Sequence, residues 1–414
     1  MDKVRLGIVG LGGRGYSFAR MAVGNPRTSL IAIADPNTER ARRVQANLGI
    51  PLQIHTNLEN LLEKSDVDAL IIATPDYQHK EQALLAFAAG KHLLLEKPIA
   101  TTVADGLAIL AAARQHDRVL YMGFNLRHHV VVREMHRLVQ EERVVGTPFY
   151  LTSVEYYNGG RSYMARWNRL KKFSGGLFVH KGTHDFDVVN WVNQPAKPRW
   201  VAASAAVNAL NLEHLPFDLK PGEKVGPYCQ ACACAYKCPD KAWPSLYGEK
   251  DGKQALFDEE TARVDSYHKD LCIFASDKDT HDNAMAIVEF DNGSRAFHSE
   301  VFVTARDNRQ YVVIGDRGHL EADLHEHTIT LYPRWTQNRV VYQVRSAAGG
   351  HGGSDPNLVD AFLRSILLGE RPLAGAVDGV WSLAVGCAAE IAREQGRIVH
   401  LAELMDVNSE LLRA

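Results

Sequence analysis

A glycine-rich turn near the start of the chain constrains the fold more than any other feature. Residues 10–15 read Gly-Leu-Gly-Gly-Arg-Gly, which matches G-x-G-x-x-G, and they directly follow an apolar run at 4–9. The first glycine permits a tight turn, the second lets the backbone approach a pyrophosphate, and the third permits close helix–strand packing. The following helix N-terminus offers unpaired N–H groups to the anion. The dinucleotide is therefore expected to contact Gly10, Gly12, Gly13, Arg14 and Gly15.

Apolar strands alternate with helices through the first 123 residues, and each strand is apolar on both faces. This pattern indicates a doubly wound parallel sheet, so we predict an NAD-binding Rossmann domain over residues 1–123. The predicted strands span 4–9, 30–34, 69–73, 92–95 and 119–123, and the predicted helices span 38–48, 58–63, 80–89 and 103–115, with a further helix up to about Val23.

After Phe124 the alternation gives way to long β-rich runs, which predict an α/β domain with a large, mostly antiparallel sheet over residues 124–414. We expect this domain to bind substrate and to mediate oligomerisation. Residues 208–283 or so are irregular, contain most of the cysteines and are interpreted as an insertion. The predicted strands span 148–156, 199–207, 284–290, 295–303, 310–315 and 328–344, and the predicted helices span about 130–141, 178–192, a segment starting at Asp355-Pro356, and about 378–395.

Composition narrows the class of protein. Lys plus Arg (47) nearly balance Asp plus Glu (49) in 414 residues, so no basic face is indicated, and nucleic acid is not an expected partner. No apolar run approaches the ~20 residues that span a bilayer, and the N-terminus lacks signal-peptide features, so no membrane partner is expected. Six cysteines are too sparse for a disulfide scaffold, which favours the cytoplasm.

Asp35 sharpens the cofactor prediction. It ends the second strand, 20 residues after Gly15, where a carboxylate accepts a hydrogen bond from the ribose 2′-OH. A carboxylate repels a 2′-phosphate, so NAD is favoured over NADP. Arg40 or Arg42 could soften this preference by folding back over the ribose, but we expect both to lie on a solvated helix face.

Three further motifs carry a family resemblance. Thr74-Pro75-Asp76-Tyr77-Gln78-His79 and Glu96-Lys97-Pro98 each end an apolar strand, and Ser174-Gly175-Gly176 precedes His180-Lys181-Gly182-Thr183-His184. In this order they resemble the Gfo/Idh/MocA oxidoreductases. The resemblance implies that Lys97 contacts the reacting hydroxyl and the nicotinamide, that the proline peptide is often cis, and that the second sheet forms homodimers or homotetramers. We extend the expected cofactor site to Thr74, Pro75, His79, Glu96 and Lys97.

The same residues can be interpreted without the resemblance. Lys97 follows a parallel strand, where open α/β sheets place ligands, and a lysine there can stabilise alkoxide character as hydride leaves. His180, His184 and Asp187 share one helix face at i, i+4, i+7, and a histidine can take a hydroxyl proton near neutral pH. Core histidines or a zinc pair are the alternatives.

Mapped by the family pattern, His184 is the catalytic histidine, whereas His180 departs from it. Many family members carry aspartate at this position, which would orient or recharge the catalytic histidine. His180 cannot do this in the same way, so His180 and Lys181 either assist the chemistry or bind substrate. By the same resemblance, Asn125, Arg127, Arg166 and Trp167 are weaker candidates near the nicotinamide or substrate, and His351 could reach the site from a glycine-rich loop.

Cysteines cluster in the irregular insertion, with Cys229, Cys232, Cys234 and Cys238 followed by Cys272. A structural zinc held by Cys229, Cys232, Cys238 and Cys272 is one interpretation; free thiols or a disulfide are the others.

Together these features predict an NAD-dependent dehydrogenase that removes hydride from a secondary hydroxyl of a sugar, sugar derivative or cyclitol. Two alternatives stay open. A redox-neutral glycosidase would retain NAD, oxidise C3 transiently and eliminate the aglycone. A sensor would bind NAD or sugar without turnover.

Overall fold

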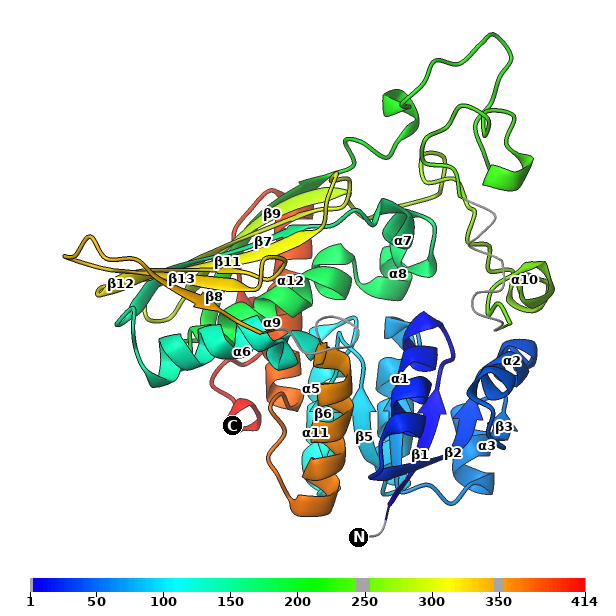
Figure 1. Ribbon diagram of the computed structural model, residues 1–414, viewed down its shortest axis with the longest axis horizontal. Helices are drawn as coiled ribbons and strands as arrows, with labels where there is room; N and C mark the ends of the chain where they lie inside the picture. Colours follow the sequence, from blue (N-terminus) through cyan, green and yellow to red (C-terminus); the bar gives the residue numbers. More distant parts are fainter. Residues whose placement is uncertain (1–2, 243–253, 346–352, 414) are drawn as a thin grey trace.

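The computed structural model describes residues 3–242, 254–345 and 353–413. Within these ranges, six parallel strands form one sheet in the order β3-β2-β1-β4-β5-β6, so the predicted Rossmann arrangement is confirmed (Figure 1). The strand order reverses between β1 and β4, and ligands of such sheets bind outside the carboxyl ends at this point. The strands are β1 (Val4–Val9), β2 (Thr28–Ala34), β3 (Gln53–His55), β4 (Ala69–Ile72), β5 (His92–Leu95) and β6 (Leu120–Met122).

Alternate residues of these strands are buried on opposite faces of the sheet. Leu6 and Ile8 pack with α1, α2 and α11, whereas Leu70 and Ile72 pack with α3, α4 and α5. Helix α11 comes from far along the chain and completes the first of these layers (Figure 1). The helices are α1 (Gly13–Gly24), α2 (Thr38–Leu48), α3 (Leu58–Lys64), α4 (His79–Ala88), α5 (Val103–Gln115) and α11 (Ser354–Leu368).

Nine strands of the described chain form a second sheet in the order β14-β13-β12-β11-β7-β10-β9-β8-β15. In these ranges β7 and β10 run parallel and the other neighbours antiparallel, which confirms a mostly antiparallel sheet. The strands are β7 (Pro148–Tyr156), β8 (Pro198–Ala206), β9 (Asn283–Phe290), β10 (Arg295–Val301), β11 (Asn308–Gly315), β12 (Gly318–Asp323), β13 (Thr328–Pro333), β14 (Val340–Gln343) and β15 (Val399–His400).

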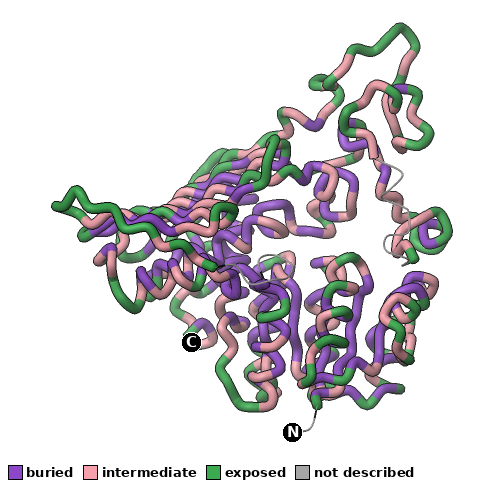
Figure 2. Tube along the Cα trace, in the orientation of Figure 1, coloured by how far each residue is buried: buried purple, intermediate pink, exposed green. Residues whose placement is uncertain are grey.

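Helices cover one face of the second sheet, so the main core lies between it and the parallel sheet. Figure 2 shows that buried residues run through both sheets and the helices between them, whereas most residues of the insertion are exposed or half-buried. These helices are α6 (Val130–His136), which continues as a π-helical turn over Arg137–Glu141, α9 (Thr183–Val192), which follows a π-helical turn over Phe178–Gly182, and α12 (Ala376–Gln395). Shorter helices of the same part of the chain are α7 (Gly160–Met164), α8 (Lys171–Ser174) and α10 (Glu259–Asp265), the last of which lies in the insertion.

The structure departs from the predicted elements in a few places. The predicted strand 328–344 is broken after β13, where Trp335 adopts a positive φ of 66°. β12 was not predicted because Gly318–Asp323 contains no β-branched residue, and three-residue β3 is too short to show a period. In the parts of the chain that the structure describes, no helix combines the length and apolar character needed to cross a membrane.

Candidate active site

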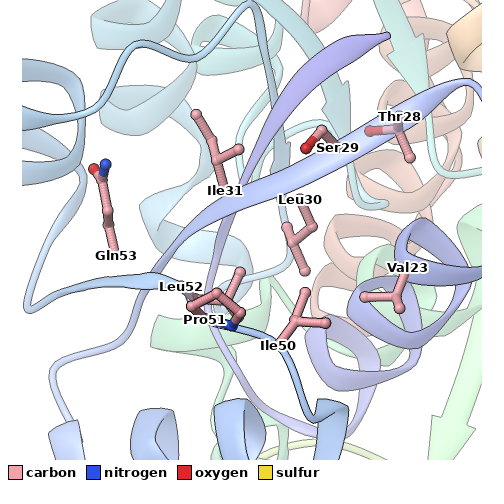
Figure 3. A pocket seen from close by; sticks show the side chains of 9 residues that line it. All are labelled: Val23, Thr28, Ser29, Leu30, Ile31, Ile50, Pro51, Leu52 and Gln53. Atoms are coloured by element: carbon pink, nitrogen blue, oxygen red, sulfur yellow. The ribbon is translucent and has the colours of Figure 1, made fainter.

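A pocket of about 1190 Å³ lies between the carboxyl ends of the parallel strands and the second sheet. A second depression of about 620 Å³ lies at the amino ends of β2 and β3, and none of its nine lining side chains is titratable (Figure 3). The larger pocket is therefore the candidate active site. The predicted site residues that line it are Gly10, Gly12, Gly13, Arg14, Asp35, Thr74, Pro75, Glu96, Lys97, Asn125, Arg166, Trp167, His180, Lys181 and His184.

The glycine loop has the geometry that a dinucleotide requires. Gly10 adopts a φ of +85°, and a Cβ on Gly15 would lie 1.8 Å from the Gly10 carbonyl oxygen. No heavy atom lies within 4 Å of where a Cβ of Gly12 or Gly13 would stand, so the backbone there is open to the pocket. Gly15 itself does not line the pocket, because it serves the packing of α1 on β1. The loop fits a bound pyrophosphate.

Asp35 is buried at the end of β2, as its position predicted. Its carboxylate accepts hydrogen bonds from Leu11 N (2.7 Å) and Asn37 N (2.8 Å), and Arg40 Nη1 lies 3.3 Å away. Burial raises the pKa of Asp35, partly against the charge of Arg40. The expectation that Arg40 lies on a solvated face is wrong: it is 7% exposed because the insertion covers it, whereas Arg42 is exposed.

Lys97 is half-buried, follows β5 and lines the pocket. Its peptide bond to Pro98 is cis, as the resemblance implied, and its Nζ donates to the His180 carbonyl oxygen at 2.8 Å. Burial lowers the pKa of Lys97, although the carboxylates of Asp76 and Glu96 oppose that shift. Glu96 in turn accepts a hydrogen bond from Arg14 Nε at 2.5 Å. Lys97 therefore brings a partly desolvated ammonium to the pocket.

A carboxylate from another element lies beside His180 itself and not beside His184. Asp76, just after β4, places Oδ2 2.6 Å from His180 Nδ1, and Asn168 Nδ2 lies 3.1 Å from His180 Nε2. Burial raises the pKa of Asp76 well above its ordinary value, and burial together with the charge of Lys97 lowers that of His180. The buried Asp76 and the half-buried His180 therefore form a pair that can hold one proton between them.

His184 lies one turn further along the same helical segment and is a half-buried residue of the pocket wall. Its Nδ1 has no hydrogen-bond partner among the described residues, and its ring contacts Phe124 edge-on. Burial, together with the charge of Lys97, lowers the pKa of His184 well below its ordinary value. The ring is therefore neutral and able to accept a proton.

Lys181 faces the second sheet rather than the histidines. Its Nζ lies 2.7 Å from Glu155 Oε1, and Arg309 Nη2 lies 2.5 Å from the same oxygen. Glu155 raises the pKa of Lys181, overcoming the opposing effect of burial. Glu155 Oε2 and Arg166 Nε are buried without partners in the described chain. This side of the pocket therefore offers fixed charges to a polar ligand.

Two candidate residues lie behind the pocket. Both ring nitrogens of His79 face backbone carbonyls, with Nδ1 2.7 Å from Pro98 O and Nε2 3.2 Å from Thr74 O, and His79 does not line the pocket. Arg127 is 2% exposed and binds the Asp187 carboxylate through two hydrogen bonds of 2.8 and 2.7 Å. Both residues hold neighbouring segments in place. His351 lies outside the described residues.

The structure does not support the predicted zinc site. No group of three or more His, Cys, Asp or Glu in the described ranges is arranged to hold a metal ion, and all six cysteines are free thiols. The sulfur atoms have other surroundings. Cys272 packs in an apolar cluster with Cys238 at its edge, while Gly226 N donates to Cys232 Sγ and Ala242 N to Cys229 Sγ, both at 3.4 Å. The cysteines thus stabilise the insertion as small, buried or half-buried side chains.

Several pocket residues were not predicted. Asp76 had a detectable signal, since it is a carboxylate at the carboxyl end of a parallel strand. Glu155 and Arg309 had none, because they become neighbours only through the register of β7 with β11. Phe257, Asp265 and Tyr267 come from the insertion and also line the pocket.

Comparison with known proteins identifies the family. Residues 4–124 match the Gfo/Idh/MocA model described as an oxidoreductase family with an NAD-binding Rossmann fold, and residues 140–401 match the model of its C-terminal alpha/beta domain. The chain belongs to the Gfo/Idh/MocA oxidoreductase family. It is an NAD-binding oxidoreductase, so the predicted enzyme class is confirmed.

Two curated relatives illustrate the range of similarity. A Bacillus subtilis protein named as the oxidoreductase YteT is 30% identical over 362 residues, covering 79% of this chain and 80% of its own. Inositol 2-dehydrogenase 1 of Saccharopolyspora erythraea is 30% identical over 192 residues, which cover 46% of this chain and 54% of that enzyme. The second alignment therefore spans about half of the relative.

Solved structures share the fold. An oxidoreductase domain protein from Kribbella flavida superposes with a TM-score of 0.73 at 18% identity, over 97% of this chain and all of that one. The WlbA dehydrogenase of Bordetella pertussis, solved with NADH and UDP-GlcNAcA, superposes with a TM-score of 0.67 at 18% identity, over 96% and 99% of the two chains.

Proposed function

We propose that this dehydrogenase moves hydride between NAD and a secondary hydroxyl of a sugar, sugar derivative or cyclitol. The observation that carries the proposal is that Lys97, His180 and His184 converge on one pocket that also contains the glycine loop and Asp35. Relatives named as inositol dehydrogenases, such as scyllo-inositol 2-dehydrogenase (NAD(+)) of Bacillus subtilis, support this substrate class.

Each residue has a role that follows from its contacts. The backbone of Gly10–Gly13 and the Asp35 carboxylate would hold NAD, which supplies the hydride acceptor when bound. Lys97 Nζ would donate a hydrogen bond to the reacting oxygen and stabilise its developing negative charge. His184, neutral through burial, would accept the hydroxyl proton on its imidazole ring.

The Asp76–His180 pair would orient Lys97, because the His180 carbonyl oxygen accepts a hydrogen bond from Lys97 Nζ. The pair would also exchange a proton with a group bound in the pocket. Lys181, Arg309 and Glu155 would bind further hydroxyls. The unpartnered Glu155 Oε2 suits a polyhydroxylated ligand, which can satisfy it. In this division residues 1–123 bind cofactor and residues 124–414 complete the substrate site.

A panel of cyclitols, sugars and glycosides tests the proposal when the absorbance of NADH and the release of aglycone are followed together. We expect NADH to accumulate with at least one free sugar or cyclitol. Aglycone release without net NADH would instead establish the redox-neutral glycosidase. If neither signal appears with any substrate while NAD binds tightly, the sensor interpretation replaces both.

We also propose a cytoplasmic homodimer or homotetramer. All six cysteines are free thiols, which suits a reducing compartment. The outer face of the second sheet exposes Tyr150, Met285 and Ile287 by 41, 56 and 44%, and strand register places all three on that face. Light scattering on the wild type and on Ile287→Glu should show an oligomer that the charge disrupts; a monomeric wild type would contradict this.

A further inference from the structure

The insertion forms the second wall of the pocket at the end that contains Asp35. Phe257, Asp265 and Tyr267 line the pocket opposite Asp35 and Arg40. Figure 1 shows α10 above α2, far from the second sheet in which the insertion begins and ends. A segment from outside the Rossmann domain thus reaches the part of the proposed cofactor site where the ribose would bind.

Several interactions attach this wall to α2. Asn37 Nδ2 donates to Thr261 O at 2.9 Å and to Asp265 Oδ2 at 3.0 Å. Further along α2, Asn47 and Gln254 exchange two hydrogen bonds, from Asn47 Nδ2 to Gln254 O at 3.0 Å and from Gln254 N to Asn47 Oδ1 at 2.9 Å. Arg43 also donates to Ala255 O at 2.8 Å and pairs with Asp258 and Glu260. The wall is therefore attached at points both near the pocket and away from it.

The charged side chains at the Asp35 end of the pocket disfavour the binding of a 2′-phosphate. Arg40 is paired with Asp35 on one side and with Asp265 on the other, and the Phe257 ring lies 4.8 Å from its guanidinium carbon. Burial alone would raise the pKa of Asp265, but hydrogen bonds from Asn37 and Arg40 lower it, so this carboxylate is ionised at neutral pH. Two carboxylates thus flank the Arg40 guanidinium, so its charge is already compensated before a 2′-phosphate carrying about two negative charges could bind.

We propose that the insertion is a cofactor-selectivity element, in which Asp265 holds Arg40 away from a 2′-phosphate and Phe257 forms an apolar wall over the dinucleotide. The proposal rests on the proposed NAD site and adds a second carboxylate, from outside the Rossmann domain, to the discrimination that Asp35 provides.

The test is titration calorimetry of NAD⁺ and NADP⁺ with the full-length wild type and three variants. Asp265→Asn keeps an oxygen that accepts from Asn37 and Arg40, so the wall stays attached while one negative charge is lost. We expect its NADP⁺ affinity to rise about tenfold while its NAD⁺ affinity changes less than about threefold. Phe257→Ala should weaken both dinucleotides about equally.

Glu259→Gln is the matched control, because Glu259 belongs to the same helix and is exposed, yet does not line the pocket. We expect it to leave both affinities unchanged. An unaltered NADP⁺/NAD⁺ ratio in Asp265→Asn, or an equal change in Glu259→Gln, overturns the proposal. If the wild type and all variants bind neither dinucleotide, the proposed function itself is contradicted. Thermal unfolding of each variant confirms that it is folded.

Discussion

Two histidine–carboxylate pairs in this protein have the same short N···O distance, but one lies at the pocket and the other in the core. His180 Nδ1 lies 2.6 Å from Asp76 Oδ2 at the pocket, and His281 Nε2 lies 2.6 Å from Glu300 Oε1 in the core. Neither side chain of the core pair is exposed, and the rings of Phe178 and Phe302 contact His281. The pair itself therefore does not define an active site; access to a pocket does.

The carboxylates of the two pairs also differ in the direction of their pKa shifts. Burial alone would raise the pKa of Glu300, but hydrogen bonds from His281 and His298 lower it to about 2. Burial raises the pKa of Asp76 well above its ordinary value, although the charge of Lys97 opposes this shift. Glu300 is therefore a fixed anion that holds the core together, whereas the raised pKa of Asp76 makes that carboxylate more readily protonated.

The largest effect on turnover should come from replacing Lys97. This change tests whether the Asp76–His180 pair belongs to a catalytic site or is only a polar feature of the pocket. Lys97→Met removes the ammonium beside His180, and we expect kcat to fall at least about 10³-fold, with NAD⁺ affinity within about threefold of wild type. Steady-state kinetics and calorimetry measure the two quantities. Lys64→Met, on the exposed end of α3, is the control. Retained turnover in Lys97→Met would show that the pocket pair serves another role.

Removing the core carboxylate should affect stability and leave chemistry intact. Glu300→Gln leaves His281 and His298 without their charged partner, so we expect the free energy of unfolding to fall by about 3 kcal/mol. Urea denaturation measures this change, and kcat per folded molecule should match the wild type. A large loss of kcat at unchanged stability would reverse the assignment of the two pairs.

The same pair predicts how stability depends on pH. Because the folded pKa of Glu300 is depressed to about 2 from an ordinary 4.5, its contribution is present above about pH 4.5 and is lost as pH falls toward 2. The difference in unfolding free energy between wild type and Glu300→Gln should therefore shrink across this window. A difference that stays constant with pH would show that Glu300 is not charged in the fold.

In contrast to Glu300, replacing Asp76 should affect turnover and leave stability close to that of the wild type. Asp76→Asn keeps an acceptor for His180 Nδ1 but loses the exchangeable proton, so we expect kcat to fall about 10²-fold. The pH profile of kcat should lose one ionisation, while thermal stability and NAD⁺ affinity stay close to wild type. An unshifted pH profile would assign Asp76 a purely structural role like that of Glu300.

Asn168 should give the smallest effect. Its amide Nδ2 lies 3.1 Å from His180 Nε2, on the side of the ring away from Asp76. Asn168→Ala removes one neutral hydrogen bond, so kcat should fall only about fivefold, which corresponds to about 1 kcal/mol. A loss as large as that of Asp76→Asn would mean that both nitrogens of His180 are equally important.

Local patterns predicted most of the fold and the reactive side chains. The runs 4–9, 38–48, 92–95, 103–115 and 148–156 have the predicted bounds because each pattern depends on neighbouring residues in the chain. Lys97 and His184 were found because each follows a recognisable short motif. Asp76 was part of such a motif, but its partner His180 is 104 residues away, and no local pattern indicates that pairing.

By itself, therefore, the sequence determined the Rossmann unit, the NAD-binding turn and the lysine and histidines of the site. Backbone propensity and glycine geometry act within a few residues, so these features can be recognised in the linear chain. Only the tertiary structure decided that the Asp76 carboxylate pairs with His180, and that Arg40 and Arg43 lie under the insertion instead of in solvent. These pairs join residues 104 to 225 positions apart, and only the packing of whole elements brings them together.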